Sequence, residues 1–270
     1  MVTIFIPVLL LGAGNTADFW KAVWPMGILV VLALGGMNMY FVLNRRMINY
    51  LEKEDWPALS EYLEKKIFQE GRYSRRNVRL LSQSYLVLGN FEAVLRLESK
   101  VTELKPDLAA ENVLLFTSAR LLDNTAENAP NKAVEYLKSC LENKNAADVY
   151  SGDMEWIRWY YGFSMIRVKT PGKSFIDDAL AIFGDLALNA KDIPVAGLSV
   201  YFICQTMGKN FCAGDNLYDA AETGKARVQK KVKTIKRWQR KVDKLTSEVH
   251  GIIIKTYLNE TGLWLFPAGK

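Results

Sequence analysis

The stretch YLVLGNFEAVLRLESKVTELKP, residues 85–106, decides the fold of this chain. Its apolar residues recur every three or four positions, which predicts helices, and Gly89 with Asn90 interrupts that pattern as a turn would. A second helix is expected to end at Pro106, because a proline inside a helix removes a hydrogen bond and clashes with the preceding turn. The stretch therefore predicts two helices joined by a tight turn.

The spacing within this hairpin is specific. Gly89 follows Tyr85 by four residues, Phe91 follows Gly89 by two, and Pro106 closes the unit 17 residues after the glycine. A glycine permits the tight turn, and the aromatic side chains are expected to fill the space between the helices. The pattern resembles the tetratricopeptide repeat, a helix-turn-helix unit of about 34 residues. The matching positions are Leu81, Tyr85, Gly89, Phe91, Leu104 and Pro106.

The hairpin also departs from the repeat pattern and requires neighbours. Valines at 94 and 101 replace two small alanines, and Glu98 stands where an aromatic residue is usual, so altered packing between helices is expected. One unit cannot bury its own apolar face, and a repeat therefore needs adjacent copies. Weaker copies of the second helix contain Trp56, Ala133 and Ala179.

These observations predict an all-α fold. The resemblance implies a TPR-like helical repeat domain over residues 44–210, since no strand-like alternation of apolar and polar residues occurs there. An irregular helical domain, which shares the alternation of helices without a true repeat, is the alternative.

Residues 24–43, WPMGILVVLALGGMNMYFVL, contain no charged residue. Twenty residues at about 1.5 Å rise each span the hydrocarbon core of a bilayer, so we predict a transmembrane helix, with a buried core helix as the alternative. Trp24 and Tyr40 at its ends are typical of membrane interfaces. No glycine or proline lies between Tyr40 and Trp56, so the helix is expected to continue to about Lys53.

The charges beside this segment indicate its orientation. Arg45 and Arg46 follow it directly, and the positive-inside rule then places the bulk of the chain in the cytoplasm, anchored by one pass in the inner or plasma membrane. A periplasmic or other extracytoplasmic location is the alternative. Residues 1–23 are expected to form a short apolar segment and a loop, and a cleaved signal, a short span and a surface segment all remain open for residues 1–14.

The sequence GAGNTA at residues 12–17 fits the glycine pattern of a dinucleotide-binding turn. Its context does not fit, because Pro7 interrupts the strand that should precede it and an apolar span follows. We expect a flexible turn there, and no cofactor.

Residues 225–244 hold ten basic residues and one acidic residue, a local charge of +9. The whole chain carries +6, so the remainder carries −3, and the basicity belongs to this segment alone. Residues 211–270 are expected to form a long basic helix and an apolar tail, Gly262 to Pro267, that folds back onto the last helices. A heptad seam is predicted at Val228, Ile235, Trp238, Val242, Leu245, Val249 and Ile252.

A narrow apolar seam leaves the other faces of the helix to cations. Three interpretations remain: a capping helix with solvated charges, attraction to an anionic membrane, and an acidic protein or nucleic-acid partner. Nucleic acid is disfavoured because stacking aromatics are missing around the cations. The residues predicted to bind an anionic surface are Lys230, Lys231, Lys233, Lys236, Arg237, Arg240 and Lys241.

Catalysis is not expected. The single histidine, His250, lies beside the apolar seam, and no phosphate-binding loop, HExxH motif or paired-cysteine motif occurs. We therefore predict no catalytic, cofactor or metal site.

The architecture resembles single-span TPR scaffolds of bacterial membranes, which implies a scaffold or adaptor that binds components of a membrane complex. In that family the first helix of each unit lines the binding groove. Carried over by register, the groove residues are Arg76, Arg79, Gln83, Arg120, Trp156 and Trp159. For both tryptophans a core position is the alternative, and for the whole chain the alternative function is electrostatic binding of lipid or nucleic acid through residues 225–244.

Overall fold

The computed structural model confirms an all-α fold, because the described residues form helices and contain no strand. The chain divides into two compact units, residues 1–59 and 60–270. The structure does not describe the whole chain, and for residues 2–23, 25, 207 and 215 it describes the backbone but not the side chain. The described ranges are 2–123, 128–143, 150, 153–169, 171–207, 215–245, 251 and 254–267.

The first unit consists mainly of one long helix, α1 (Val2–Glu52). Within Met26–Glu52, an apolar window has a mean hydropathy of 2.0 and none of it is buried, so this part is long and apolar enough to cross a membrane, as a signal sequence near an N-terminus also is. The predicted continuation beyond Arg46 is confirmed, since the helix ends at Glu52. The predicted turn at residues 12–17 is wrong, because α1 runs through them, and no strand precedes them as a dinucleotide site requires.

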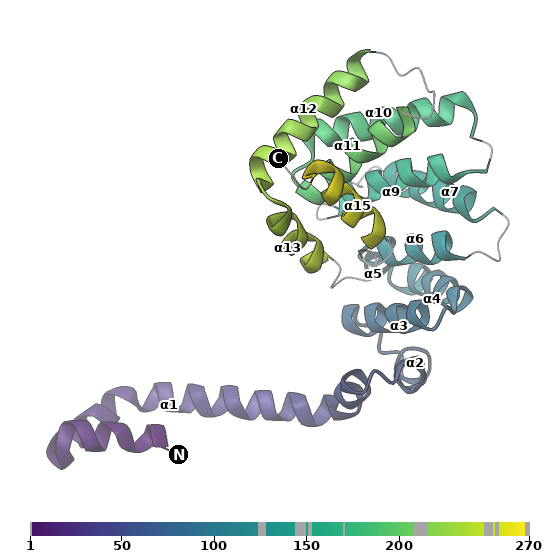
Figure 1. Cartoon of the computed structure of the whole chain (residues 1–270). Helices are drawn as coiled ribbons and strands as arrows, with labels where there is room; N and C mark the ends of the chain where they lie inside the picture. Colours follow the sequence, from purple (N-terminus) through teal and green to yellow (C-terminus); the bar gives the residue numbers. More distant parts are fainter. Residues whose placement is uncertain are drawn as a thin grey trace. The chain divides into compact units, whose positions relative to one another are not determined.

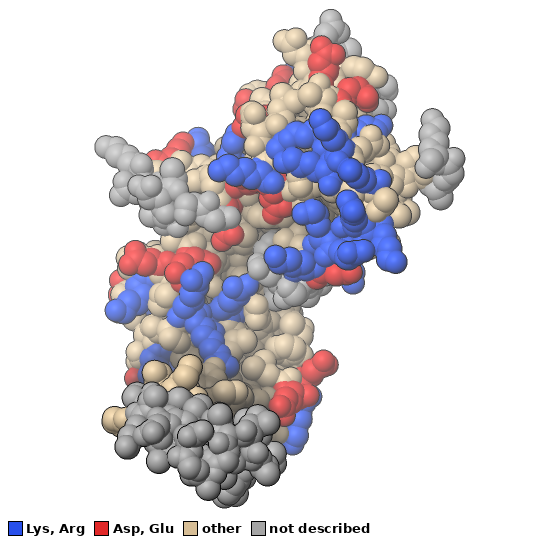
Figure 2. Space-filling view, turned by 90° about the vertical axis from the view of Figure 1, so that its left-hand side faces the viewer, with Lys and Arg blue, Asp and Glu red and all other residues tan. Residues whose placement is uncertain are grey.

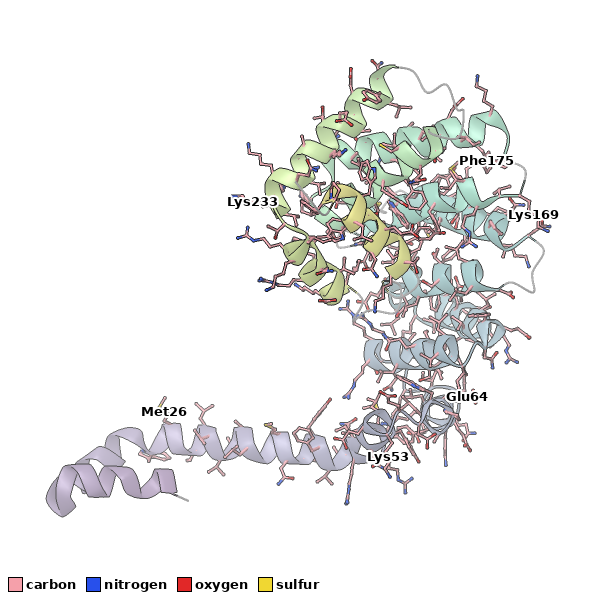
Figure 3. The ribbon with its side chains drawn as sticks, in the orientation of Figure 1. Met26, Lys53, Glu64, Lys169, Phe175 and Lys233 are labelled. Atoms are coloured by element: carbon pink, nitrogen blue, oxygen red, sulfur yellow. The ribbon has the colours of Figure 1, made fainter. Side chains whose placement is uncertain are left out.

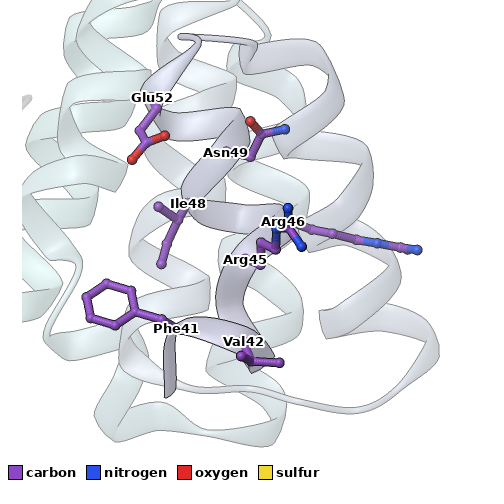
Figure 4. Close-up of a pocket in the computed structure, with 7 residues that line it drawn as sticks. All are labelled: Phe41, Val42, Arg45, Arg46, Ile48, Asn49 and Glu52. Atoms are coloured by element: carbon purple, nitrogen blue, oxygen red, sulfur yellow. The ribbon is translucent and has the colours of Figure 1, made fainter. Parts of the chain in front are cut away.

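The end of α1 changes from apolar to charged (Figure 4). Phe41 and Ile48 lie on one side of the ribbon, and Arg45 on the other. Two arginines directly after an apolar span are the feature from which the orientation was predicted. After α1, Asp55 begins α2 (Trp56–Glu64) by accepting a hydrogen bond from the Ala58 amide at 3.2 Å.

The second unit is a stack of short helices (Figure 1). Its first part contains η1 (Lys65–Gln69), α3 (Arg75–Val87), α4 (Phe91–Leu104), α5 (Pro106–Ala110), α6 (Val113–Leu122) and α7 (Ala129–Leu141). Its second part contains α9 (Met154–Arg167), α10 (Lys173–Asn189), α11 (Ile193–Met207), α12 (Asp215–Val232), α13 (Ile235–Leu245) and α15 (Lys255–Leu265).

The hairpin of α3 and α4 forms where the sequence predicted it. Gly89 has a φ of +70°, a conformation that favours glycine, and the Asn90 side chain then caps α4 by accepting from the Ala93 amide at 3.2 Å. Helix α4 ends at Leu104, two residues before Pro106. Local sequence therefore determines this pair of helices.

The helices after α3 stack as successive pairs. Helix α6 packs against both α3 and α9, and α9 packs against α11, so the first helices of the pairs form one layer. Helices α4, α7, α10 and α12 are the second members of these pairs, and α12 packs against both α10 and α11. The arrangement is a helical array, as predicted.

The single long basic helix that was predicted is wrong. Helix α12 ends at Val232, Lys233 adopts a φ of +63°, and α13 begins at Ile235. Thr234 precedes α13 and its hydroxyl accepts from the Arg237 amide at 3.4 Å. A non-glycine residue with positive φ interrupts the helix, so the cations lie on two helices and the turn between them.

Candidate functional site

One face of α3 carries three of the residues predicted to line a binding groove. Arg76 is exposed, and Arg79 and Gln83 are half-buried. Their spacing of three and four residues puts them on one side of the helix, and Val87, 51% exposed, continues the same line. The sequence reasoning missed Val87, although the same spacing could have identified it. These four residues are called the α3 face below.

The other side of α3 is held firmly in the unit. Val78 and Leu81 are fully buried, and the Tyr85 hydroxyl donates to Glu64 at 2.6 Å. The Ser74 hydroxyl caps the helix by accepting from the Asn77 amide at 3.2 Å. The backbone that presents the α3 face is therefore fixed before any partner binds.

Arg120 was also predicted to line the groove, and the structure places it in an ion pair between α4 and α6. Its guanidinium pairs with Glu98 at 2.7 Å, donates to the Phe116 carbonyl at 3.1 Å and lies over the Tyr136 ring. The side chains of Arg120 and Glu98 are only 16% and 8% exposed. Glu98, which stands where an aromatic residue is usual in the repeat, is thus paired with an arginine of the next helix pair. Burial raises the pKa of Tyr136, and the negative charge of Glu98 nearby raises it further.

Trp156 and Trp159 are core residues, which makes their assignment to the groove wrong. Both are buried, the Trp156 indole donates to the Asp192 carboxylate at 3.0 Å, and Trp159 stacks on Phe163 with ring centroids 5.0 Å apart. Burial raises the pKa of the Asp192 carboxyl, and the hydrogen bond from Trp156 opposes this effect.

The C-terminal helices cover the face of α9 and α11 that would continue the groove (Figure 1). Tyr257 of α15 contacts Phe163 and Phe202, with ring centroids 5.5 and 5.2 Å away. The Tyr201 hydroxyl donates to Glu260 of α15 at 2.9 Å. The predicted return of the apolar tail onto the last helices is confirmed, because Trp264 also lies against the Tyr201 ring.

Trp238 of α13 fixes this covering segment. Its indole is 1% exposed and donates to the Leu258 carbonyl at 2.9 Å. A Cβ atom added at Gly197 or at Gly262 would lie 2.5 Å from the Trp238 ring, so glycine at both positions permits the contact. Val242 is buried beside it and Val228 is buried in α12, which confirms three positions of the predicted seam, while Val249, His250 and Ile252 lie outside the described residues.

Nine of the ten cations in residues 225–244 fall into two groups. Arg227 donates to the Ala187 and Ala190 carbonyls at the end of α10, and Lys225 lies over the Trp264 ring at 4.4 Å, so these two stabilise the fold. The seven cations predicted to bind an anionic surface are all exposed. They are called the basic surface below: Lys230, Lys231, Lys233, Lys236, Arg237, Arg240 and Lys241.

The basic surface covers the face that carries α12 and α13 (Figure 2). Lys233, in the turn between them, extends away from the ribbon (Figure 3). Val228, Val232 and Trp238 on the opposite sides of these helices are buried. From Val228 to Val242 the helices therefore use one side for packing and present the cations on the other.

Among the described residues, no group of three or more His, Cys, Asp or Glu is placed to hold a metal ion. Burial raises the pKa of the Cys140 and Cys204 thiols, which disfavours the reactive thiolate.

The sequence model of one protein family matches residues 93–267, and its description is "Uncharacterised Treponema protein". The chain belongs to this family. The part of the chain that matches the family model begins in α4 and contains the aromatic core, the C-terminal helices and the basic surface. Helix α1 and the α3 face precede it.

A relative from Treponema pallidum (strain Nichols), described as "Uncharacterized protein", is 38% identical over 106 residues. That match covers 38% of this chain and 34% of the relative, so the chain matches about a third of that protein's length.

Proposed function

We propose that this chain is a membrane-anchored scaffold or adaptor, whose TPR-like helical array binds another protein of a membrane-associated complex. The observation that carries the proposal is the α3 face, an accessible line of two arginines, a glutamine and a valine on a helix fixed from behind. Arginine is enriched at the residues that dominate protein interfaces, and a fixed backbone lowers the entropic cost of binding.

Helix α1 supplies the anchor in this proposal. An exposed apolar segment from Met26 to Glu52 fits a single membrane pass. Arg45 and Arg46 beyond its apolar part favour a cytoplasmic array on the inner or plasma membrane by the positive-inside rule. The proposal assigns the chain no catalysis and no cofactor.

A crosslinking pull-down of the tagged full chain from native membranes tests this function. We compare the wild type with Arg79→Glu, which reverses a charge at the centre of the α3 face, and with five glutamine substitutions in the basic surface. The five are Lys230→Gln, Lys231→Gln, Lys233→Gln, Lys236→Gln and Arg237→Gln.

The proposal predicts a defined set of proteins that survives nuclease and high salt and is depleted by Arg79→Glu. The glutamine variant should retain that set. Equal loss from both variants, or recovery of only nucleic acid or lipid that high salt removes, would contradict the scaffold function.

A further inference from the structure

The basic surface is unusual in how completely its charge is separated from the apolar side of the same helices. Its seven cations are exposed, as is the neighbouring Lys244, and in residues 225–245 the only acidic residue is Asp243. Val228, Val232, Trp238 and Val242 of the two helices face the core instead. Such a surface offers long-range attraction to an anion without apolar side chains to insert.

The cations are also held in place by the fold. Trp238 is fixed between Gly197 and Gly262 and bonded to the Leu258 carbonyl, so α13 is tied to both α11 and α15. Arg227 ties α12 to the end of α10. A surface ordered in advance loses little entropy when it meets an extended anionic partner.

The chemistry of the surface favours a membrane over a nucleic acid or an acidic protein. Single-stranded nucleic acids stack their bases on aromatic rings, and the aromatic ring of α13, Trp238, is buried. Five of the seven cations are lysines, which act as point charges and lack the paired geometry with which arginine recognises single carboxylates and phosphates. An anionic leaflet is a diffuse field of charge that needs neither stacking nor paired geometry.

We propose that the basic surface docks the second unit on the anionic headgroups of the membrane that holds α1. The proposal rests on the membrane anchor of the proposed function. A tether converts this docking into an intramolecular step with a high effective concentration, so a surface too weak to recruit a soluble protein is sufficient here.

Fluorescence quenching of the full chain in nanodiscs tests the docking. In a background of Cys140→Ser, Cys204→Ser and Cys212→Ser, one fluorophore is attached at Gln239→Cys, an exposed position within α13, and in a second sample at Glu135→Cys, an exposed position on α7. The discs contain phosphatidylcholine alone or with about 30% phosphatidylglycerol, and both carry lipid with a spin label in the headgroup.

The proposal predicts roughly threefold stronger quenching at position 239 in the anionic discs than in the neutral discs, and loss of that difference at high salt. Quenching at position 135 should not depend on the lipid. The five glutamine substitutions in the basic surface should abolish the difference at position 239. Five matched substitutions of exposed lysines elsewhere should preserve it: Lys105→Gln, Lys132→Gln, Lys169→Gln, Lys173→Gln and Lys191→Gln.

Equal quenching in both discs, or a difference that survives the five substitutions, would overturn the proposal. A second contradicting result has two parts. The wild type in neutral discs would bind transfer RNA or polyglutamate in a salt-resistant way that the five substitutions remove, and the quenching at position 239 would not depend on the lipid. A chain that fails to elute with either disc would refute the anchor itself. A chain that elutes with both and shows no lipid dependence refutes only the docking.

Discussion

Helices α3 and α9 occupy equivalent places as first members of their pairs, yet one presents an accessible face and the other is enclosed. On α3 the groove residues Arg76, Arg79 and Gln83 are exposed or half-buried, whereas on α9 Trp156 and Trp159 are buried. Trp159 packs among Phe163, Phe183 and Phe202, whose rings come from α9, α10 and α11, and Trp156 is hydrogen-bonded to Asp192, so the neighbouring helices enclose this side of α9. The register of a helix shows which residues share a face, and the packing of the neighbouring helices decides whether that face stays open.

The largest expected difference between α9 and α3 is in how much a substitution lowers the free energy of unfolding. Trp159→Ala should lower the free energy of unfolding by about 4 kcal/mol, because it leaves a cavity among stacked rings. Urea unfolding of the full chain in detergent, followed by far-UV circular dichroism, measures this. Arg79→Ala is the matched change on α3 and should cost under about 0.5 kcal/mol. Similar losses from both would remove the distinction between the two helices.

Substitution of Arg120 tests whether its ion pair with Glu98 stabilises the packing of α6 on α4. Arg120→Met should cost about 3 kcal/mol by the same unfolding measurement, since it leaves a buried carboxylate without its cation. Adding Glu98→Leu should restore most of the loss, because the unpaired charge is then gone. A single variant as stable as the wild type would show that Glu98 does not depend on Arg120.

Gly197→Ala should disturb the covering segment selectively. Its new methyl group would meet the rigid Trp238 ring, and we expect a loss of about 2 kcal/mol together with faster tryptic cleavage at the lysines of α13. Gly172→Ala is the control, because its added carbon has no heavy atom within 4 Å. Cleavage of α13 at the wild-type rate in Gly197→Ala would show that the contact does not hold the covering segment.

The smallest expected effect is a pH dependence at Asp192. Its pKa in the folded state is raised above the unfolded value, mainly by burial, so its contribution to stability is present below the unfolded pKa and is lost as pH rises through the folded pKa. Asp192→Asn keeps an oxygen to accept the Trp156 hydrogen bond and should flatten this part of the curve at pH values above the unfolded pKa of about 4. Melting temperatures of both proteins across that range measure it. Parallel curves would contradict the raised pKa.

Local signals predicted much of the fold. The hairpin around Gly89, the extension of α1 to Glu52, the return of the tail and the exposure of the basic surface follow from turn residues, helix-breaking residues and apolar spacing. The tetratricopeptide resemblance and the cytoplasmic location stay predictions. Helix α9 did carry a warning of its enclosure, because apolar residues occupy every side of it, as in a buried helix.

Other features depended on contacts that no local pattern reveals. The break at Lys233 has no glycine or proline to signal it. The pair of Glu98 with Arg120 and the enclosure of Trp238 between Gly197 and Gly262 join residues far apart in sequence, so only the packed structure brings them together.

Site-specific photocrosslinking tests the central claim most directly. A photoreactive amino acid replaces Gln83 on the α3 face in one sample and Gln205, an exposed glutamine of α11, in another, and the full chain is irradiated in native membranes. The account predicts a discrete protein adduct from position 83 that Arg79→Glu abolishes, and none from position 205. Equal adducts from both positions, or an adduct from position 205 alone, would contradict the assignment of the α3 face as the binding surface of a membrane scaffold.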